Sequence, residues 1–386
     1  MTKTHAIVAG VAMTPFSKLA PVSADVLAAQ AVRQLIDRTG IAPEAIDEAY
    51  FGSSKGGGLI GQRTLRFTGV TGGIPVYNVE NACASSAVAF NLAHRAIVAG
   101  DATCALVVGV DKLSTLGKGT LPVQETEWDG AAGVTNPVVY ALRARRYMHE
   151  TGASPEDLAA VVVKSRRFAD LNPVAQMKGT VSIDEVLQSK MIADPLTLYQ
   201  CSPKSDGAAA LLLVSSDRAS ELGLSGPRVR ASVVKSGRFS MAERDITRPD
   251  ITSRAAAEAF EIAQLGPADL DVVELHDAFS IAELLYSEEL GLCAEGEAPD
   301  FVRSGASSSL AKSAHPLVNP SGGLIGRGHP VGATGVAQIV ECFDQLLGEA
   351  DGRQREKATT ALAHVTGGGA SGFDNGACAV TILTTD

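Results

Sequence analysis

Residues 319–335 read NPSGGLIGRGHPVGATG, with six glycines among seventeen residues. So many glycines indicate that the backbone passes close to a ligand or to another segment. The stretch has neither the GxGxxG spacing of a dinucleotide-binding loop nor the Gly-Lys-Ser/Thr ending of a P-loop. It precedes a predicted helix over 334–347 and a predicted strand over 359–364. His329 lies near its centre and is a candidate base for a thiol.

A second special residue precedes a helix earlier in the chain. Residues 78–86 read NVENACASS and lead into a predicted helix over 84–99, followed by a strand over 104–109. The strand, helix, turn and strand predicted in residues 5–52 also recur, from the helix onward, in residues 255–275. We therefore predict an internal duplication of an α/β unit. Chance similarity between Ala-rich helices is the alternative.

The region between the two units breaks this pattern. Residues 111–198 contain polar, Pro-containing turns and a helix for which Ser154 is a favourable N-cap. We interpret the region as a cap inserted into the first half, because an apolar strand returns at 208–214. The predicted domains are an N-terminal half over 1–115 plus 199–235, an inserted loop domain over 116–198 and a C-terminal half over 236–386.

Composition and charge exclude several classes of protein. The 386 residues are 45% hydrophobic and 20% charged, the balance of a compact globule with more than one packed domain. The net charge of −10, without a long basic tract, argues against nucleic-acid binding. No stretch approaches the roughly 20 apolar residues that span a bilayer. The short apolar run after Lys3 resembles the start of a signal peptide, but it is better explained as a first strand.

The six cysteines, at positions 83, 104, 201, 293, 342 and 378, show no CxxC spacing. We therefore expect no metal site and a reduced, cytoplasmic protein in which most cysteines are small buried residues. Cys83 differs in its context, since a thiol at the start of a helix sees unpaired N–H groups and the positive end of the dipole. The sequence predicts an activated thiol there, with a merely buried cysteine in a crowded turn as the alternative.

Two further segments end predicted strands. Residues 273–280 read VELHDAFS, in which His276 could donate to a developing oxyanion while Asp277 sets its tautomer. A surface His-Asp pair is the alternative. Residues 364–369 read HVTGGG, and their backbone N–H groups could form an oxyanion hole.

Together, the NxxCAS turn, the HDAF block, the GHPxGA block and the terminal glycine loop resemble the thiolase superfamily along nearly the whole chain. HDAF, rather than NEAF, makes the chain similar to the branch of sterol-carrier-protein thiolases and archaeal acetyl-CoA acetyltransferases. The resemblance implies an α/β fold of two duplicated αβαβα halves with an inserted loop domain. It also implies a homodimer or a dimer of dimers.

The resemblance implies a role for each candidate residue. Cys83 would carry the acyl group, His329 would activate it, and His276 with His329 would stabilise the enolate oxygen. Backbone N–H groups of Cys83, Gly367 and Gly368 would hold the tetrahedral oxyanion. The reaction would be ping-pong transfer between acyl-CoA and CoA, with coenzyme A as substrate and no permanent cofactor.

The sequence departs from the family pattern at the second acid/base. Val365 stands where ordinary thiolases have a cysteine, and Ala278 where sterol-carrier relatives have one. Four groups remain as candidates for moving the Cα proton, namely His364, Cys201, Tyr140 and Cys83 itself.

We expect a thiolase that cleaves a 3-oxoacyl-CoA with CoA or condenses two acyl-CoAs. A thiolase-fold retro-aldol lyase acting on a CoA ester is one alternative, although such a reaction needs no acyl-enzyme. A CoA-binding subunit that is active only with a partner is another. Relatives in this branch pair with a small zinc-containing OB-fold subunit, and the resemblance makes such a partner an expectation here.

Overall fold

The fold was analysed in a computed structural model, which describes residues 5–18, 22–117, 119–121, 130, 132–238, 245–248, 250–371 and 374–385. Its strands form two five-stranded arrays with the same internal order. The first array runs β3 (Val76–Val79), β2 (Glu48–Gly52), β4 (Cys104–Lys112), β7 (Asp206–Ser215), β1 (Ala6–Met13). The second runs β10 (Leu317–Val318), β9 (Val272–Glu274), β11 (Thr360–Ser371), β12 (Asp374–Thr384), β8 (Arg228–Ser236).

Strand directions confirm the predicted duplication. In each array the first two pairings are parallel and the last two are antiparallel. The arrays join where Ile7 of β1 pairs with Arg228 of β8, which makes one continuous ten-stranded sheet. Because parallel neighbours need a crossover connection, each array carries its helices on its faces.

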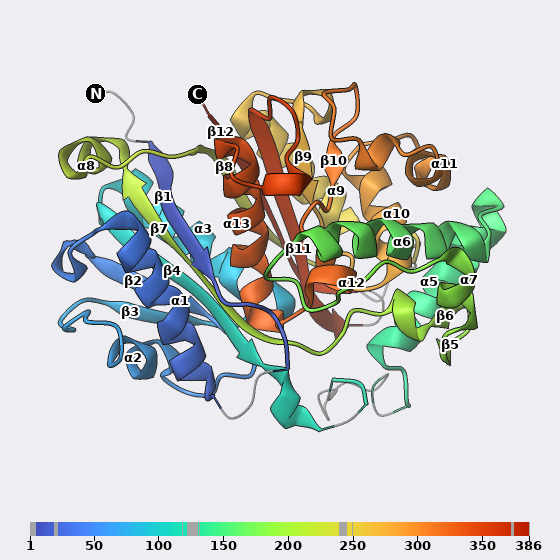
Figure 1. The fold of residues 1–386 in the computed structure, drawn as a ribbon, viewed down its shortest axis with the longest axis horizontal. Coiled ribbons are helices and arrows are strands. Elements are labelled where there is room, and N and C mark those ends of the chain that lie inside the picture. The colour runs from blue at the N-terminus through green and yellow to red at the C-terminus, as the bar shows by residue number, and fades with distance from the viewer. Residues whose placement is uncertain are drawn as a thin grey trace.

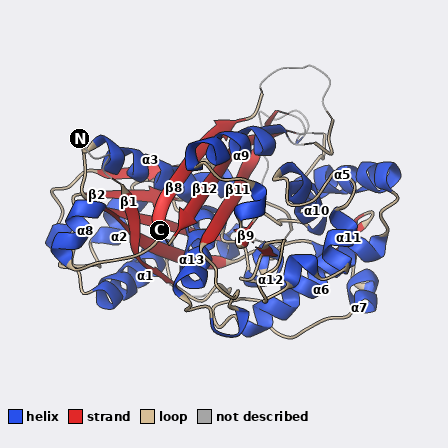
Figure 2. Ribbon diagram, turned by 90° about the horizontal axis from the view of Figure 1, so that it is seen from above, coloured by secondary structure: helices blue, strands red, loops and turns tan. Residues whose placement is uncertain are grey.

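The helices complete five layers. α3 (Ser85–Ala99) and α13 (Thr334–Leu347) contact each other and strands of both arrays, so they form the middle layer. α1 (Ala24–Thr39) covers the outer face of the first array together with α2 (Ile60–Leu65), and α9 (Asp250–Ala263) covers the outer face of the second (Figures 1 and 2). This αβαβα arrangement is the predicted fold class.

Burial distinguishes the middle layer from the outer ones. α13 is buried along almost its whole length, whereas α1 alternates buried and exposed residues as an amphipathic surface helix does. Within the described residues, the segment Ala82–Ala99 is also long and apolar enough to cross a membrane, but 56% of it is buried. Its place between the two strand arrays is that of a core helix.

The inserted region is more regular than its sequence predicts. It contains α5 (Asn136–Thr151), α6 (Pro155–Leu171), α7 (Ile183–Gln188), β5 (Met191–Ala193) and β6 (Leu196–Thr197). The predicted cap of α6 is present, because Ser154 and Asp157 form a reciprocal capping box. α6 packs against α10 (Ser280–Glu289), α11 (Ala298–Arg303) and α12 (Gly323–Arg327), all of which belong to the C-terminal half.

The topology also bears on the boundary between the halves. β8 pairs with β12 along most of its length and takes the place in the second array that β1 takes in the first. A boundary between Ser215 and Arg228 is therefore favoured, near the short helix α8 (Ser216–Leu222). The sequence-based division kept 199–235 with the N-terminal half. The remaining short helical turns are η1 (Pro43–Ala45), η2 (Ala82–Ala84), η3 (Leu113–Leu116), η4 (Leu198–Gln200), η5 (Pro267–Asp269), η6 (Ala306–Ser308), η7 (Val331–Ala333) and η8 (Asp351–Arg353).

Candidate active site

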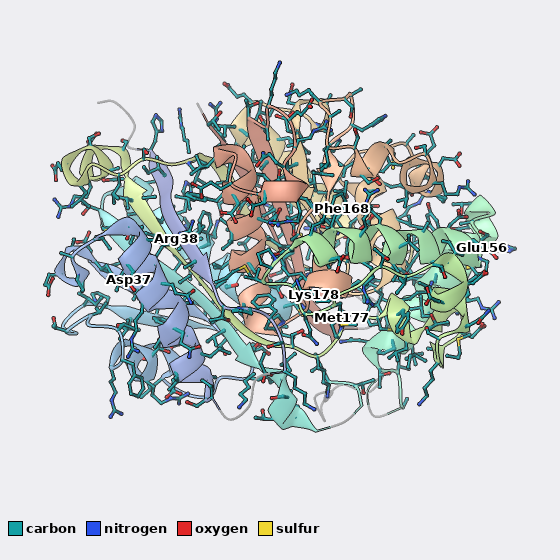
Figure 3. The ribbon with its side chains drawn as sticks, viewed as in Figure 1. Asp37, Arg38, Glu156, Phe168, Met177 and Lys178 are labelled. Carbon is teal, nitrogen blue, oxygen red and sulfur yellow. The ribbon has the colours of Figure 1, made fainter. Side chains whose placement is uncertain are left out.

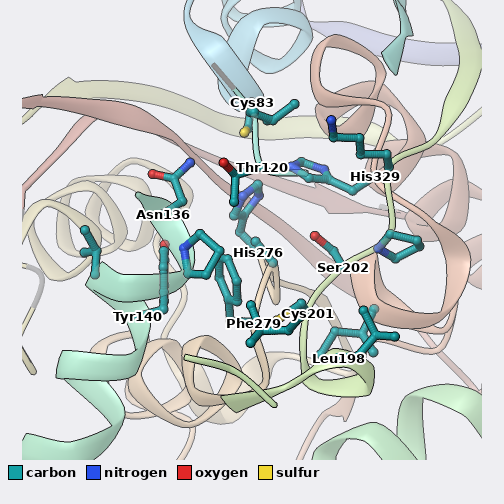
Figure 4. A pocket seen from close by; sticks show the side chains of 18 of the residues that line it. Cys83, Thr120, Asn136, Tyr140, Leu198, Cys201, Ser202, His276, Phe279 and His329 are labelled. Atoms are coloured by element: carbon teal, nitrogen blue, oxygen red, sulfur yellow. The ribbon is translucent and has the colours of Figure 1, made fainter. Parts of the chain in front are cut away.

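Cys83 lies in η2, between the edge strand β3 and the first turn of α3. The backbone there is tightly wound, with Ala82 at φ 48°. The Ser85 hydroxyl donates to the carbonyl of Ala82 at 2.6 Å and accepts from the N–H of Asn81 at 2.9 Å, which closes the turn. Cys83 is half-buried and its side chain reaches a cavity (Figure 4).

The glycine loop of β11 packs directly against this turn. A Cβ on Gly367 would lie 2.2 Å from the carbonyl oxygen of Asn81, so only glycine allows the approach. Gly368 has φ 44° and lines the same cavity as Cys83. Its backbone N–H hydrogen-bonds to the Cys83 sulfur. The predicted oxyanion donors therefore include one N–H that already points at the reacting group.

The resting thiol of Cys83 is neutral. Burial raises the pKa of Cys83 to about 12, and the nearby carboxylate of Asp111 adds to this. The N–H groups of Gly368 and of Cys83 itself act in the opposite direction but do not offset burial. The start of the helix therefore does not by itself ionise the thiol. A base must accept the proton when the substrate binds.

His329 is oriented to be that base. Its Nδ1 lies 2.8 Å from the hydroxyl of Thr334, and that hydroxyl donates to the carbonyl of Pro330 at 3.1 Å. Since the hydroxyl proton is used there, the hydroxyl accepts from Nδ1–H, which leaves Nε2 of His329 unprotonated. Burial lowers the pKa of His329 to about 3, with a smaller contribution from Arg327. The ring is therefore neutral at physiological pH.

Close helix packing brings the two turns together. The hydroxyl of Ser86 in α3 accepts from the N–H of Val336 in α13 at 3.1 Å. Gly335 allows the approach, since a Cβ there would lie 2.7 Å from the backbone nitrogen of Ala87. Asp111 at the end of β4 accepts from the N–H of Gly332 at 2.6 Å. The nucleophile and the base thus belong to a rigid junction between the halves.

His276 is the third predicted side chain, and it lies beside Cys83 and His329. Its ring lies 5.1 Å from that of His329, centroid to centroid, at an interplanar angle of 81°. The Cys83 sulfur and one ring nitrogen of each histidine all lie within 4.8 Å of one another. Burial, together with the neighbouring His329, holds the pKa of His276 well below its usual range. The three predicted residues meet at one side of a cavity of about 560 Å³ (Figure 4).

Asp277 does not set the tautomer of His276. Its carboxyl group accepts from the N–H of Leu324 at 2.7 Å, and burial raises its pKa well above the usual range. In the described part of the chain, Nδ1 of His276 has no hydrogen-bond partner. The predicted pairing fails because Asp277 faces the start of α12, where Gly323 leaves room for it.

A buried polar frame supports both histidine turns. Glu274 pairs with Arg327 at 3.2 Å, and both side chains are almost fully buried. Asn319, at φ 52°, accepts from the N–H of Leu275 at 2.8 Å and donates to Glu283 at 3.2 Å. These contacts fix residues 274–276 against residues 319–327.

The candidates for moving the Cα proton lie in different places. His364 is not part of the cavity wall; its Nε2 lies 3.1 Å from the hydroxyl of Thr252 on α9. Cys201 does line the cavity, but its thiol contacts the carbonyl of Thr197 at 3.4 Å, and burial raises its pKa to about 12. In Figure 4 it lies at the opposite end of the cavity from Cys83.

Tyr140 lines the cavity on the side of α5. Its hydroxyl lies 3.2 Å from that of Tyr286, which is in turn 3.2 Å from the hydroxyl of Thr366 and accepts from the amide of Asn375 at 3.2 Å. Burial raises the pKa of Tyr140 well above 10, and Cys83 is close enough to contribute to that rise. Tyr140 is therefore a neutral hydroxyl within a hydrogen-bonded chain at the cavity wall.

Several residues of the site were missed in the sequence. Thr334 stands five residues after His329, within a motif already singled out, so its role could have been considered. Arg143 lies one helical turn after Tyr140, at the i,i+3 spacing that places two side chains on one face. Tyr286 and Asn375 reach the site only through the tertiary fold, and no local pattern marks them.

The expectation of no permanent cofactor stays a prediction. One thiol and two imidazoles are also a ligand set that zinc accepts. The expectation of no metal is untested and stays a prediction.

Comparison with known proteins shows the family to which the chain belongs. Residues 6–217 match the family model of the thiolase N-terminal domain, and residues 232–377 match that of the thiolase C-terminal domain. The chain is 41% identical to the benzoylsuccinyl-CoA thiolase subunit BbsB of Thauera aromatica over 94% of both chains. It is 39% identical to the acetyl-CoA acetyltransferase of Methanothermobacter thermautotrophicus, over 94% of this chain and 96% of that one.

Solved structures show the same likeness. The Ltp2-ChsH2(DUF35) aldolase superposes with a TM-score of 0.84 at 26% identity, over 99% of this chain and 98% of that one. Human mitochondrial 3-ketoacyl-CoA thiolase, at 17% identity and a TM-score of 0.75, covers 100% and 99% and shares the fold. The two family models and the relatives that match over nearly the full length show that this chain belongs to the thiolase family.

Proposed function

We propose that the protein cleaves a 3-oxoacyl-CoA with CoA, or runs the reverse condensation, through an acyl group carried on Cys83. The observation that carries the proposal is the meeting of one thiol and two neutral imidazoles within 4.8 Å at a cavity wall. A cavity of about 560 Å³ lies within the range of roughly 300–1,000 Å³ typical of small-molecule sites.

In the first half-reaction, the thiol proton of Cys83 moves to Nε2 of His329 as the sulfur attacks the 3-oxo carbon. The N–H groups of Gly368 and Cys83 donate hydrogen bonds to the developing oxyanion. The C2–C3 bond then breaks, the acyl group stays on sulfur, and the electron pair passes to an enolate beside His276. The neutral imidazole of His276 can stabilise that oxygen by donating a hydrogen bond from its ring N–H.

The enolate then takes up a proton at C2. Tyr140 is the acid that we favour, because its raised pKa keeps the phenol protonated and its hydroxyl lies in a chain with Tyr286 and Thr366. In the second half-reaction, CoA attacks the acyl group on Cys83 and loses its thiol proton to the enzyme. That proton restores Tyr140, and the Cys83 sulfur that leaves the acyl group takes its own proton back from His329, so all three groups return to their starting states.

Mass spectrometry of the intact protein tests the acyl-enzyme. Wild type and Cys83→Ala are incubated with acetyl-CoA and with a panel of 3-oxoacyl-CoAs. We expect an adduct with the mass of the acyl group on wild type and none on Cys83→Ala. If wild type carries no adduct that the variant lacks, the proposal is wrong.

A retro-aldol activity is the second candidate, because one matching structure is an aldolase that contains a DUF35 protein. Aldol cleavage needs no acyl-enzyme, so the same mass measurement separates the two reactions. We also propose that a small OB-fold subunit supports activity. Adding extract of the native host to the purified protein should then raise turnover, and unchanged turnover would count against a required partner.

We further propose that the protein is a cytoplasmic homodimer or dimer of dimers that acts on lipid-derived thioesters. Its six cysteines are free thiols, which supports a reducing compartment. The edge strand β3 leaves Tyr77 44% exposed, and α3 leaves Val98 48% exposed, which supports an association through this face. Sedimentation equilibrium measures the mass of the assembly, and a monomer at micromolar concentration would contradict it.

A further inference from the structure

Tyr286 lies behind the cavity wall, next to the hydroxyl of Tyr140. It belongs to α10 and is fully buried, whereas Tyr140 of α5 lines the cavity. The two hydroxyl oxygens are 3.2 Å apart. In Figure 4 the Tyr140 hydroxyl points toward the end of the cavity that holds Cys83. Tyr286 is not one of the residues that line the cavity, so it can act on a substrate only through Tyr140.

Three other side chains fix the position of Tyr286. Its ring lies 4.7 Å from that of His364, centroid to centroid, at an interplanar angle of 62°. Its hydroxyl oxygen lies 3.2 Å from the hydroxyl of Thr366 in β11 and accepts from the side-chain amide of Asn375 in β12, also at 3.2 Å. Thr366 and Asn375 are only 2% and 8% exposed. The Tyr286 hydroxyl is therefore held in one place beside Tyr140.

The direction of these hydrogen bonds follows from what each group can donate. The amide nitrogen of Asn375 only donates, so it occupies one lone pair of the Tyr286 oxygen. When the Thr366 hydroxyl occupies the other, Tyr286 has its own proton left for Tyr140. Tyr140 then accepts from Tyr286 and keeps its own proton free for the cavity. Each donor in such a chain polarises the next, so the buried amide strengthens the bond to Tyr140.

Proton transfer at C2 turns Tyr140 into a buried anion. The O–H bond of Tyr140 breaks, a C–H bond forms at C2, and the negative charge moves from the enolate oxygen to the phenolate. Burial opposes this charge, since it raises the pKa of Tyr140 well above its usual range. A hydrogen bond to a charged group is stronger than one to a neutral group, so the Tyr286 hydroxyl stabilises the phenolate more than the phenol. The same phenolate is the base at C2 in the condensation direction.

We infer that Tyr286, oriented by Asn375 and Thr366, is the positioning residue for proton transfer between Tyr140 and the substrate carbon. This inference rests on the proposed thiolase function and adds the groups that its C2 step needs. Acyl transfer between CoA and Cys83 does not involve C2. A thiol also exchanges its proton readily with water, whereas a C–H bond does not, so only the C2 step should depend on Tyr286.

One incubation measures the two steps separately. Acetyl-CoA is mixed with isotopically labelled CoA in heavy water, and mass spectrometry follows two rates. Exchange of the CoA label into acetyl-CoA reports acyl transfer through Cys83, and deuterium uptake by the methyl group reports proton transfer at C2. Tyr286→Phe should slow deuterium uptake by about ten- to a hundredfold, the effect of one lost hydrogen bond to a charged group, and leave label exchange within about threefold of wild type. Tyr140→Phe should slow deuterium uptake by about 10²- to 10⁴-fold.

Two further variants test the direction of the chain and the specificity of the effect. Asn375→Asp keeps the shape of the side chain but presents a carboxylate, which only accepts, so Tyr286 turns its proton away from Tyr140. Deuterium uptake should then fall at least as far as in Tyr286→Phe. Tyr147→Phe is the matched control, because it removes a buried hydroxyl of the same helix that donates to Glu288 outside the cavity. The control should leave both rates unchanged.

A selective loss of deuterium uptake in Tyr286→Phe and Asn375→Asp would support the inference. Unchanged uptake in either variant, or an equal loss of both rates, would overturn it. Wild type that exchanges the label but takes up no deuterium would overturn it as well. Failure of the thiolase proposal looks different, because wild type itself would then show neither label exchange nor an acyl adduct.

Discussion

The two turns that meet at the active site stand at equivalent places in the duplicated halves, yet they are built differently. In the N-terminal half, β3 leads through residues 80–84 directly into α3; Glu80 is exposed and residues 81–83 are half-buried. In the C-terminal half, β10 and α13 are separated by residues 319–333, which include α12 and are buried throughout. Because of this longer connection, a ring nitrogen of His329 lies within 4.8 Å of the Cys83 sulfur.

The difference separates two requirements of the reaction. The nucleophile must be reached by a bulky thioester, so its turn lies at an edge and opens onto the cavity. The base must keep one tautomer and one position, so the turn that carries His329 is enclosed by Arg327, Glu274 and Asn319. Met177 and Lys178, labelled in Figure 3, follow α6 of the inserted region, and the N–H of Met177 donates to the carbonyl of Gly326 in this enclosed segment at 3.0 Å.

The largest expected effect comes from removing the groups that the two turns contribute. Cys83→Ala and His329→Ala should each lower kcat/KM for thiolysis by about 10³- to 10⁴-fold, because proton transfer and attack form one step. The double variant should be no slower than the slower single variant. If the two losses multiply instead, the turns act independently and the pairing of Cys83 with His329 is wrong.

The next largest effect is a loss of stability when the buried ion pair beside the C-terminal turn is broken. Arg327→Met leaves the buried carboxyl of Glu274 without its partner and should lower the free energy of unfolding by about 3–5 kcal/mol. Arg38→Met removes a pair with Glu349 of similar length, but its side chains are 52% and 49% exposed, so the loss should be below about 1 kcal/mol. Urea denaturation measures both.

A compensating variant sharpens this test. Replacing both partners, as Arg327→Met with Glu274→Leu, should recover much of the lost stability, because no buried charge remains unpaired. If the double variant is as unstable as Arg327→Met alone, the ion pair is not the cause and local packing around α12 is.

The two turns also differ in how far the sequence predicts them. Cys83 and His329 were found from their places before helices, and the duplicated topology follows from the recurring order of strands and helices. The buried polar contacts around the His329 turn were not predicted, because Glu274 and Arg327 are 53 positions apart and only the fold joins them. Asp277 was assigned to the wrong partner for the same reason, since neighbours in sequence at the end of a strand point in opposite directions.

The inserted region was the least predictable part. The helix after Ser154 was predicted, but its surroundings were not: α6 has many buried residues and packs against α10 and α12 of the other half. Lys164 of α6 forms a buried ion pair with Glu283 of α10. A charged residue in a helix is usually exposed, so the sequence alone favours the wrong environment for Lys164.

A smaller effect is expected from the group that orients His329. Thr334→Val removes the hydroxyl that accepts from Nδ1 but keeps the shape of the side chain, and should lower kcat by about ten- to a hundredfold. Thr334→Ser restores the hydroxyl and should stay within about threefold of wild type. Steady-state thiolysis with one 3-oxoacyl-CoA compares them, and equal rates for the Val and Ser variants would show that the hydroxyl does not orient the ring.

The smallest expected effect is a pH dependence of the free energy of unfolding that comes from His329. The folded-state pKa of His329 is about 3, whereas a histidine in the unfolded chain has a pKa of about 6.5. Between these values the unfolded state binds a proton that the folded state does not, so wild type loses stability as pH falls below about 6.5. His329→Gln lacks this group. The stability of wild type minus that of the variant should therefore drop by about 1.4 kcal/mol between pH 7.5 and 5.5. Urea denaturation of both proteins at the two pH values measures this difference.

A difference that stays constant would mean that His329 is protonated as easily in the fold as in the unfolded chain. The C-terminal turn would then be as open to solvent as the turn that carries Cys83.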